Sequence, residues 1–377
     1  MLIKNIFTVQ SDLAAASLAS RGGTDGVCSL LLRRPGDAGD VLREVGRSAL
    51  GRADQSLDMS GRGLQTVLNV LFNNEPQFKH KTAGTIRFAG IRKQGDTAMT
   101  EPMPGVSGDL SYIRRSGSGS VVVFLHGIGS SAASFAPLFG YLPADLSLLA
   151  WNAPGYSNSA PLAEDWPMAG DYADALAGLL DRLGHGAVHL VGHSLGTLIA
   201  AVFARRSPDR VQSLTLAAAA KGYGVPRGGK LPDGVAARLT DLARLGPAAF
   251  ASARAANLVH EPERHPEIVK SVEAAMAQVN PAGYAQAVRM LASGDLPGDL
   301  AHVAARPGFI IGAQDRVTPM AQTLAAADAW EAAKGAHPTV TEIDRAGHAV
   351  YLQRPDAFCT ALLDHMGLPA ARNPEGA

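Results

Sequence analysis

The chain has 377 residues, of which 46% are hydrophobic and 18% charged, so it can form one large domain or two ordinary domains with a buried core. Lysine plus arginine equals aspartate plus glutamate at 34 each, and this balance excludes a global basic field that would recruit nucleic acid or an anionic membrane. The two cysteines, Cys28 and Cys359, are too few for a disulfide framework and fit a reducing compartment.

The amino terminus does not have the pattern of a signal peptide. It begins Met-Leu-Ile-Lys, but Asp12 interrupts the segment before a continuous apolar stretch develops. No apolar run in the sequence reaches the length of a membrane-spanning helix. We therefore expect a soluble cytoplasmic protein that binds neither a membrane nor nucleic acid.

Residues 1–98 show poor periodicity and differ in composition from the rest of the chain. The part from 21 to 63 is rich in Arg, Gly, Asp and Ser, which leaves little apolar surface to bury. Residues 64–72 fit a helix and residues 85–92 fit a strand. We expect 1–98 to be a poorly ordered extension. Two alternatives are an interaction role and a native start at Met99, which would make the preceding segment non-native.

From residue 110 onward, short apolar runs alternate with segments of helical periodicity. The predicted strands are 110–114, 121–125, 146–151, 188–191, 211–216, 308–311 and 339–343. The predicted helices are 171–183, 198–203, 320–333 and 355–366. This alternation predicts an α/β protein with a parallel sheet that is covered by helices on both faces.

Residues 221–303 interrupt the alternation. This stretch contains helical pieces such as 234–245 but no convincing strand. Because it lies between two predicted strands, we expect an inserted helical cap over the carboxyl ends of the sheet. The core then consists of residues 99–220 and 304–369, followed by a short flexible tail to the end of the chain at 377.

The sequence Gly192-His193-Ser194-Leu195-Gly196 is the most informative motif, and it lies between a predicted strand and a predicted helix. Glycine two residues away on each side leaves room for the serine backbone to take a strained conformation. Such a turn presents the Ser194 hydroxyl at the carboxyl end of the sheet, next to the free N–H groups of a helix. We therefore predict that Ser194 is a nucleophile.

A serine hydroxyl needs a base that takes its proton and a third group that orients the base. His348 follows the last predicted strand and is the candidate base, whereas Asp315 follows the preceding strand and is the candidate acid. Both loops are expected at the same edge of the sheet as Ser194. Asp344 is a weaker candidate for the acid, and His193, next to the serine, is interpreted as structural.

The order Ser194, Asp315, His348 along the chain is that of the α/β-hydrolase family. Residues 108–369 resemble this family, in particular its esterases, lactonases and carbon–carbon hydrolases. The segments that carry the resemblance are Phe124–Ser130, Ala153–Tyr156, Val191–Gly196, Gly312–Val317 and Gly347-His348. The resemblance implies the α/β-hydrolase fold with an inserted helical cap, and it implies no metal and no cofactor.

A tetrahedral intermediate of acyl transfer needs two preorganised hydrogen-bond donors at its oxygen. The backbone N–H of Leu195, directly after the serine, is the first candidate. The resemblance implies that the backbone N–H of Ile128, which follows His126-Gly127, is the second. His126 itself is interpreted as a residue that stabilises its loop.

These residues imply a serine hydrolase that cleaves a small-molecule carboxylic ester or lactone through an acyl-enzyme intermediate. One alternative is hydrolysis of a carbon–carbon bond in a ring-cleavage diketo acid, with Arg254 or Arg289 binding the substrate carboxylate. Relatives with that activity usually carry tryptophan after the catalytic histidine, whereas Ala349 stands at this position and disfavours the alternative. The other alternative is a ligand-binding protein of the same fold that has no catalytic activity.

Overall fold

The computed structural model describes residues 17–18, 30–31 and 102–369. The chain divides into two units, residues 1–92 and 93–377. In the first unit, the short strands β1 (Ser17–Leu18) and β2 (Leu30–Leu31) pair in antiparallel orientation. The fold that carries the candidate site belongs entirely to the second unit.

Several expectations from the sequence concern residues outside the described part of the chain. They are the helix at 64–72, the strand at 85–92, the poor order of 1–98, the alternative start at Met99 and the flexible tail at 370–377. These expectations stay predictions.

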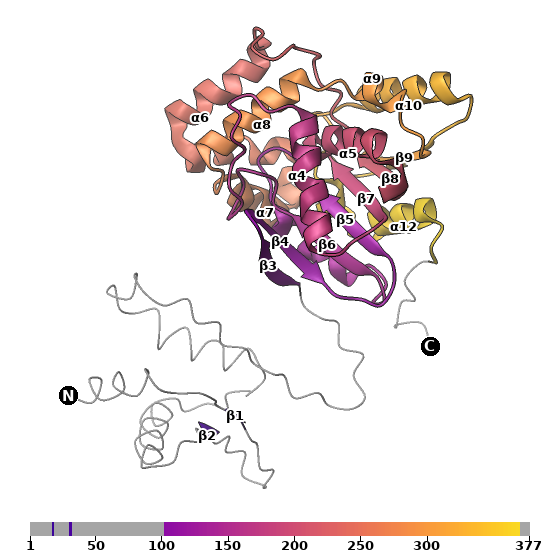
Figure 1. Cartoon of the computed structure of the whole chain (residues 1–377). Coiled ribbons are helices and arrows are strands. Elements are labelled where there is room, and N and C mark those ends of the chain that lie inside the picture. The colour runs from indigo at the N-terminus through magenta and orange to yellow at the C-terminus, as the bar shows by residue number, and fades with distance from the viewer. Residues whose placement is uncertain (1–16, 19–29, 32–101, 370–377) are drawn as a thin grey trace, which may run out of the picture. The chain divides into compact units, whose positions relative to one another are not determined.

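Eight strands of the second unit form one mixed sheet with the order β10-β9-β8-β7-β5-β6-β4-β3 (Figure 1). The strands are β3 (Met103–Ser107), β4 (Leu110–Arg115), β5 (Val121–Leu125), β6 (Ser147–Trp151), β7 (Val188–His193), β8 (Val211–Ala217), β9 (Pro307–Gly312) and β10 (Thr339–Ile343). Neighbouring strands from β10 to β6 run parallel, whereas β4 is antiparallel to both β6 and β3. The predicted α/β architecture with a mostly parallel sheet is therefore confirmed.

Helices flank this sheet, and a further group of helices is formed by the segment of the chain that connects β8 to β9. The flanking helices are η1 (Ala132–Gly140), α4 (Ala169–Arg182), α5 (Leu195–Arg206), η2 (Pro208–Arg210), α10 (Met320–Lys334), α11 (Val350–Gln353) and α12 (Pro355–Met366). Those between β8 and β9 are α6 (Asp233–Ser252), η3 (Ala255–Leu258), η4 (Pro262–Arg264), α7 (Pro266–Met276), α8 (Pro281–Ser293) and α9 (Leu296–Leu300). Among the described residues, no helix combines the length and the apolar character needed to cross a bilayer.

Alternate side chains of the central strands enter two hydrophobic cores, one on each face of the sheet. Val123 and Leu125 of β5 belong to a core shared with α4, α5, α9 and α10. Val122 and Phe124 of the same strand belong to a second core, shared with η1, α11 and α12. Because both faces are covered, these strands are apolar along their whole length, and this is why unbroken apolar runs predict them correctly.

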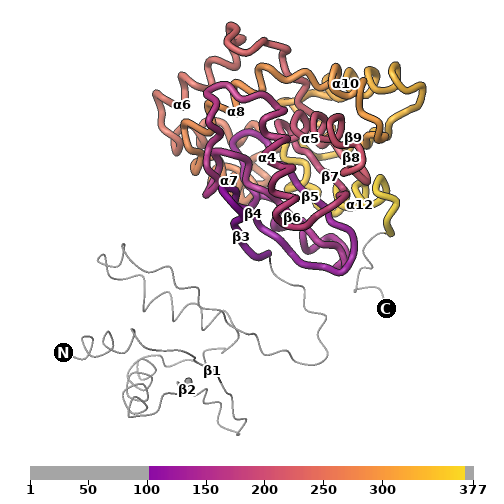
Figure 2. The backbone as a smooth tube through the Cα atoms, viewed as in Figure 1, coloured from indigo at the N-terminus to yellow at the C-terminus, as the bar shows by residue number. Residues whose placement is uncertain are grey.

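Helices α6, α7 and α8, which lie between β8 and β9 in the sequence, gather on one side of the unit, whereas α9 packs beside α10 (Figure 1). The tube in Figure 2 shows α6, α7 and α8 grouped together, apart from α10 and α12. Helix α6 is longer than the predicted helix 234–245, because it continues to Ser252 through a kink at Gly246, which is followed by Pro247. This group of helices supplies one wall of the cavity described below.

The sheet begins earlier than the sequence predicts. The apolar pattern predicts regular structure from residue 110, but β3 precedes β4 and pairs with it through a turn at Gly108. β3 is an edge strand whose Met103 and Val106 are each 64% exposed. A strand that buries so few side chains does not need a regular pattern of apolar residues, so the periodicity of the sequence does not predict it.

Candidate active site

Ser194 occupies a tight turn between β7 and α5. Its backbone has φ 50° and ψ −115°, a strained conformation for a residue with a side chain. A Cβ atom at Gly192 would clash with the backbone oxygen of Gly196, and a Cβ atom at Gly196 would clash with the backbone oxygen of Leu125. The Ser194 N–H donates to the Ala217 carbonyl of β8 at 2.9 Å, which fixes the turn against the sheet. The flanking glycines are therefore a steric requirement of this turn.

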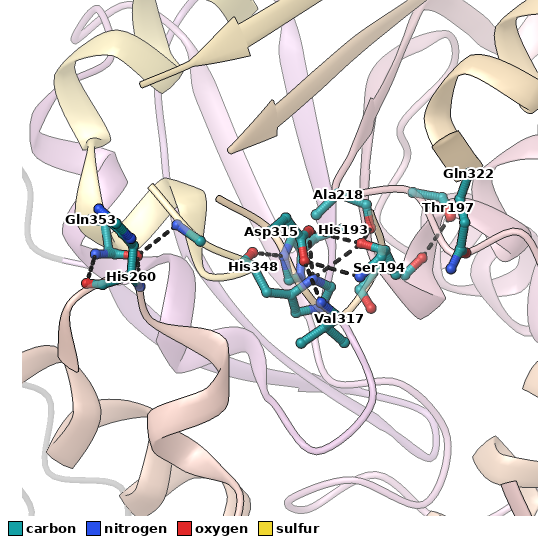
Figure 3. A network of polar contacts seen from close by, with 12 residues as sticks. His193, Ser194, Thr197, Ala218, His260, Asp315, Val317, Gln322, His348 and Gln353 are labelled. Carbon is teal, nitrogen blue, oxygen red and sulfur yellow. Dashed lines mark hydrogen bonds and ion pairs between the residues drawn. The ribbon is translucent and has the colours of Figure 1, made fainter. Parts of the chain in front are cut away.

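Asp315 and His348 lie in the loops that follow β9 and β10, and they are hydrogen-bonded to each other. His348 Nδ1 lies 2.9 Å from Asp315 Oδ2, and the His348 side chain is 4% exposed (Figure 3). Because the carboxylate accepts the Nδ1 proton, the neutral imidazole keeps Nε2 free to accept another proton. The geometry is therefore that expected of a histidine base whose ring is oriented by the Asp315 carboxylate.

Asp315 is fixed by its own loop as well as by the histidine. Its Oδ1 accepts hydrogen bonds from the backbone N–H groups of Val317 (2.8 Å) and Thr318 (2.9 Å). The Thr318 hydroxyl lies 2.8 Å from Asp315 Oδ2 and 2.9 Å from the Ala218 carbonyl. Burial alone would raise the pKa of Asp315, but the charge of His348 and these hydrogen bonds outweigh it, so the pKa lies below its usual value. No sequence motif identifies Thr318 as a partner of this carboxylate.

Among the described residues, Asp344, the weaker candidate for the acid, makes no hydrogen bond or ion pair with His348. Its side chain is 76% exposed and accepts a hydrogen bond from Gln314 Nε2 at 3.3 Å. The geometry therefore associates His348 with Asp315.

A cavity of about 440 Å³ opens over Ser194 and His348. Residues from η3, α6, α7 and α8 line its other side, among them Tyr284 and Met276. Among the hydrogen bonds of the described residues, none joins the Ser194 hydroxyl to His348. Such contacts are often long in enzymes without substrate and tighten in the complex.

The two candidate oxyanion donors, Ile128 and Leu195, line the same cavity as Ser194. Ile128 follows Gly127 in a turn closed by a hydrogen bond from the Ser130 N–H to the Gly127 carbonyl at 3.2 Å, so the turn does not use the Ile128 N–H. Leu195 is the first residue of α5, where backbone N–H groups have no partner within the helix. A Cβ atom at Gly127 would lie 2.9 Å from Ser194 Cβ, so this turn packs directly against the serine.

Two buried histidines hold the loops around the serine. His126 Nδ1 donates to the Gly127 carbonyl at 2.9 Å, and its Nε2 accepts from the Ala153 N–H at 3.1 Å. His193 Nε2 donates to the backbone carbonyl of His348 at 2.9 Å. Burial lowers the pKa of His126 to about 4, and burial together with the charge of His348 lowers that of His193 to about 3. These contacts agree with the structural interpretation of both residues.

The two lowered pKa values predict that the protein loses stability in mild acid. The unfolded chain takes up a proton near pH 6.5, whereas folded His126 and His193 stay neutral down to about pH 4 and 3, so stability is full above pH 6.5 and falls below it. Each group contributes a slope of about 1.4 kcal/mol per pH unit in that range. Urea unfolding at several pH values measures the slope. His126→Asn removes one of the two histidines, so it should lower the slope by the contribution of one proton, about 1.4 kcal/mol per pH unit. An unchanged slope in that variant would contradict the prediction.

Gln353 ties the loop of the candidate base to the helices beyond β8. Its Oε1 accepts from the Gly347 N–H at 2.8 Å and from the His260 N–H at 2.9 Å, and its Nε2 donates to the His260 carbonyl at 3.0 Å (Figure 3). A second link joins the Ala349 N–H to the Leu258 carbonyl at 2.9 Å. The cavity wall and the loop of the candidate base are thus connected through Gln353, a residue that sequence motifs do not identify.

The charged side chains that line the cavity are all basic. They are Lys221, Arg238 and Arg254. Arg289, which the sequence suggests as an alternative to Arg254, does not line the cavity and donates to the Asp165 carbonyl at 2.7 Å. Among the residues that the structure describes, no three His, Cys, Asp or Glu side chains gather in a way that could hold a metal ion.

A mostly parallel sheet with a serine at a strained turn between strand and helix defines the class of the α/β hydrolases. Comparison with known families agrees, because the model described as the alpha/beta hydrolase family matches residues 122–361. The chain belongs to the alpha/beta hydrolase family.

The chain is similar to hydrolases with different substrates. It is 39% identical over 102 residues to a 2-(acetamidomethylene)succinate hydrolase of Mesorhizobium japonicum, and this match covers 27% of the chain and 36% of that relative. It is 27% identical to a pimeloyl-[acyl-carrier protein] methyl ester esterase of Chromobacterium violaceum, over 68% of the chain and 97% of that relative. The crystal structure of an enol-lactonase from Burkholderia xenovorans has a TM-score of 0.61 at 20% identity and covers 70% of this chain and all (100%) of that one, a likeness that concerns the fold alone.

Proposed function

We propose that the protein is a serine hydrolase that cleaves a carboxylic ester or lactone. The observation that carries this proposal is the buried 2.9 Å hydrogen bond between Asp315 and His348 beside the cavity onto which Ser194 opens. A hydroxyl nucleophile, a neutral imidazole and an orienting carboxylate are the three groups that acyl transfer requires. Residues 221–303 would act as the cap that selects the substrate, and 99–220 with 304–369 would supply the catalytic core.

In the first half of the reaction, Ser194 Oγ attacks the carbonyl carbon while His348 Nε2 takes the hydroxyl proton. The carbonyl oxygen becomes an oxyanion and accepts hydrogen bonds from the N–H groups of Ile128 and Leu195. Asp315 keeps the imidazole oriented and stabilises its positive charge. The intermediate then collapses, the bond to the leaving oxygen breaks, and His348 donates its proton to the departing alkoxide.

In the second half, water attacks the acyl-enzyme. His348 takes one proton from the water, the oxyanion forms again at the same two donors, and the bond to Ser194 Oγ breaks. The serine recovers its proton and the acid leaves. For a lactone both product groups belong to one molecule, a hydroxy acid, so the same residues suffice.

A fluorophosphonate probe tests this proposal for any ester or lactone substrate, because the probe reacts with the activated serine itself. We expect stoichiometric labelling at Ser194, located by mass spectrometry of the digested protein, together with hydrolysis of some members of an ester and lactone panel. A protein that resists the probe would contradict the proposal and would favour a ligand-binding role. Heat-denatured protein is the control for non-specific labelling.

A second candidate function is hydrolysis of a carbon–carbon bond in a ring-cleavage diketo acid. It is favoured by the basic side chains of the cavity lining, where a cation could bind the substrate carboxylate, although Arg254 itself pairs with Asp241 at 3.0 Å. Ala349 after His348 speaks against it, because family members with that activity usually carry tryptophan at this position. Decay of the absorbance of a ring-fission product in the presence of the enzyme would support this candidate over ester cleavage.

A further inference from the structure

The charge of the cavity lining is one-sided. Lys221, Arg238 and Arg254 line it, and no aspartate or glutamate side chain does so among the described residues. The chain as a whole carries equal numbers of basic and acidic side chains, so this imbalance is a property of the cavity and not of the composition. A cavity of one sign concentrates ligands of the opposite sign.

Arg238 lies on α6 beside the turn that holds the candidate oxyanion donor. Its Nη1 is 3.5 Å from the hydroxyl of Tyr284, and that hydroxyl belongs to a side chain that is 1% exposed. A Cβ atom at Gly129, the residue after Ile128, would lie 3.8 Å from a ring carbon of Tyr284. Arg238 is therefore separated from the oxyanion turn by a single aromatic ring.

Arg238 has no carboxylate partner within 4.0 Å among the described residues, whereas Arg254 has one. Arg254 pairs with Asp241 at 3.0 Å and lies over the ring of Phe250 at 4.7 Å. That ring in turn packs edge-on against Tyr284 at 5.5 Å. The charge of Arg254 is thus largely balanced. Among the described residues, Lys221 and Arg238 are the lining cations without a carboxylate partner, and Arg238 is the one that carries a guanidinium.

We propose that this cavity takes an anionic substrate, an ester or lactone whose acyl part carries a free carboxylate, and that Arg238 binds this carboxylate. A guanidinium pairs with a carboxylate through two parallel hydrogen bonds, which orients the acyl chain as well as holding it. The carboxylate at Arg238 then places the scissile carbonyl between the Ile128 turn and Ser194. The inference rests on the proposed function and adds the substrate class to it.

The first test compares matched esters. Monomethyl esters of linear dicarboxylic acids are tested against methyl esters of monocarboxylic acids with the same number of carbons. We expect a preference in kcat/KM of about 10- to 100-fold for the anionic series, the range of a charge-assisted hydrogen bond. Arg238→Gln should raise KM for the anionic esters by a similar factor and leave the neutral esters unchanged, and Arg238→Lys should recover part of the loss. Arg289→Ala, in the same insertion but outside the cavity, is the matched control.

The second test measures binding without turnover. Isothermal calorimetry of the Ser194→Ala protein with the best monomethyl ester should show binding that Arg238→Gln weakens about 10- to 100-fold. Hydrolysis of both series with equal kcat/KM, or unchanged affinity in the Arg238→Gln background, would overturn the inference while leaving the serine hydrolase standing. Arg238-dependent binding without any ester hydrolysis would support the anion site and count against the proposed function.

Discussion

Ser194→Ala should lower kcat for any ester that the protein hydrolyses by about 10⁴- to 10⁶-fold. In the proposed mechanism the loss is large because the hydroxyl forms the covalent bond to the acyl group, so without it no acyl-enzyme can form. The variant should fold normally, since alanine fits the same strained backbone as serine at φ 50°. Initial rates on an activated ester, together with the loss of fluorophosphonate labelling, measure the effect.

Ser207→Ala is the matched control for that experiment. Ser207 lies at the opposite end of the same helix α5, where its N–H bonds to the Phe203 carbonyl and its side chain is only partly buried. We expect its kcat to be close to that of the wild type. Wild-type turnover in Ser194→Ala, with an intact circular dichroism spectrum, would contradict the assignment of the nucleophile.

The parts of the fold that the sequence predicts well are those whose physical cause is local. The turn at Ser194 is encoded within Gly192–Gly196, because a Cβ atom at either glycine would collide with neighbouring backbone. The central strands are buried on both faces, so each appears as an unbroken apolar run such as Val121–Leu125. The alternation of those runs with helical segments then determines a mostly parallel sheet.

The parts that the sequence does not predict depend on contacts between distant segments. Gln353 bonds to His260, 93 residues away, and no local pattern indicates such a pair. Arg238 and Arg289 look equivalent as basic residues of the insertion, and only the docking of α6 and α8 determines which one lines the cavity. The edge strand β3 is too exposed to leave an apolar signature.

Asp315→Asn should lower kcat by about 10⁴-fold near neutral pH. The amide oxygen can still accept from the Val317 and Thr318 N–H groups, so the loop should keep its shape. The amide nitrogen, however, replaces Oδ2 next to His348 Nδ1 and donates where the carboxylate accepted. The imidazole must then carry its proton on Nε2, the atom that should receive the serine proton, and it also loses the charge that stabilises its ionised form.

Asp344→Asn separates this explanation from a general effect of removing a negative charge from the same edge of the sheet. Asp344 is exposed and bonded to Gln314, so its replacement should leave kcat close to the wild-type value. Thr318→Val gives an intermediate case, because it removes the hydroxyl from Asp315 Oδ2 but keeps the carboxylate, and a loss of about 10-fold is expected from one missing hydrogen bond. We therefore expect the highest kcat for Asp344→Asn, an intermediate kcat for Thr318→Val and the lowest kcat for Asp315→Asn. A larger loss at Asp344 than at Asp315 would transfer the orienting role to the exposed carboxylate and contradict the geometry of the buried pair.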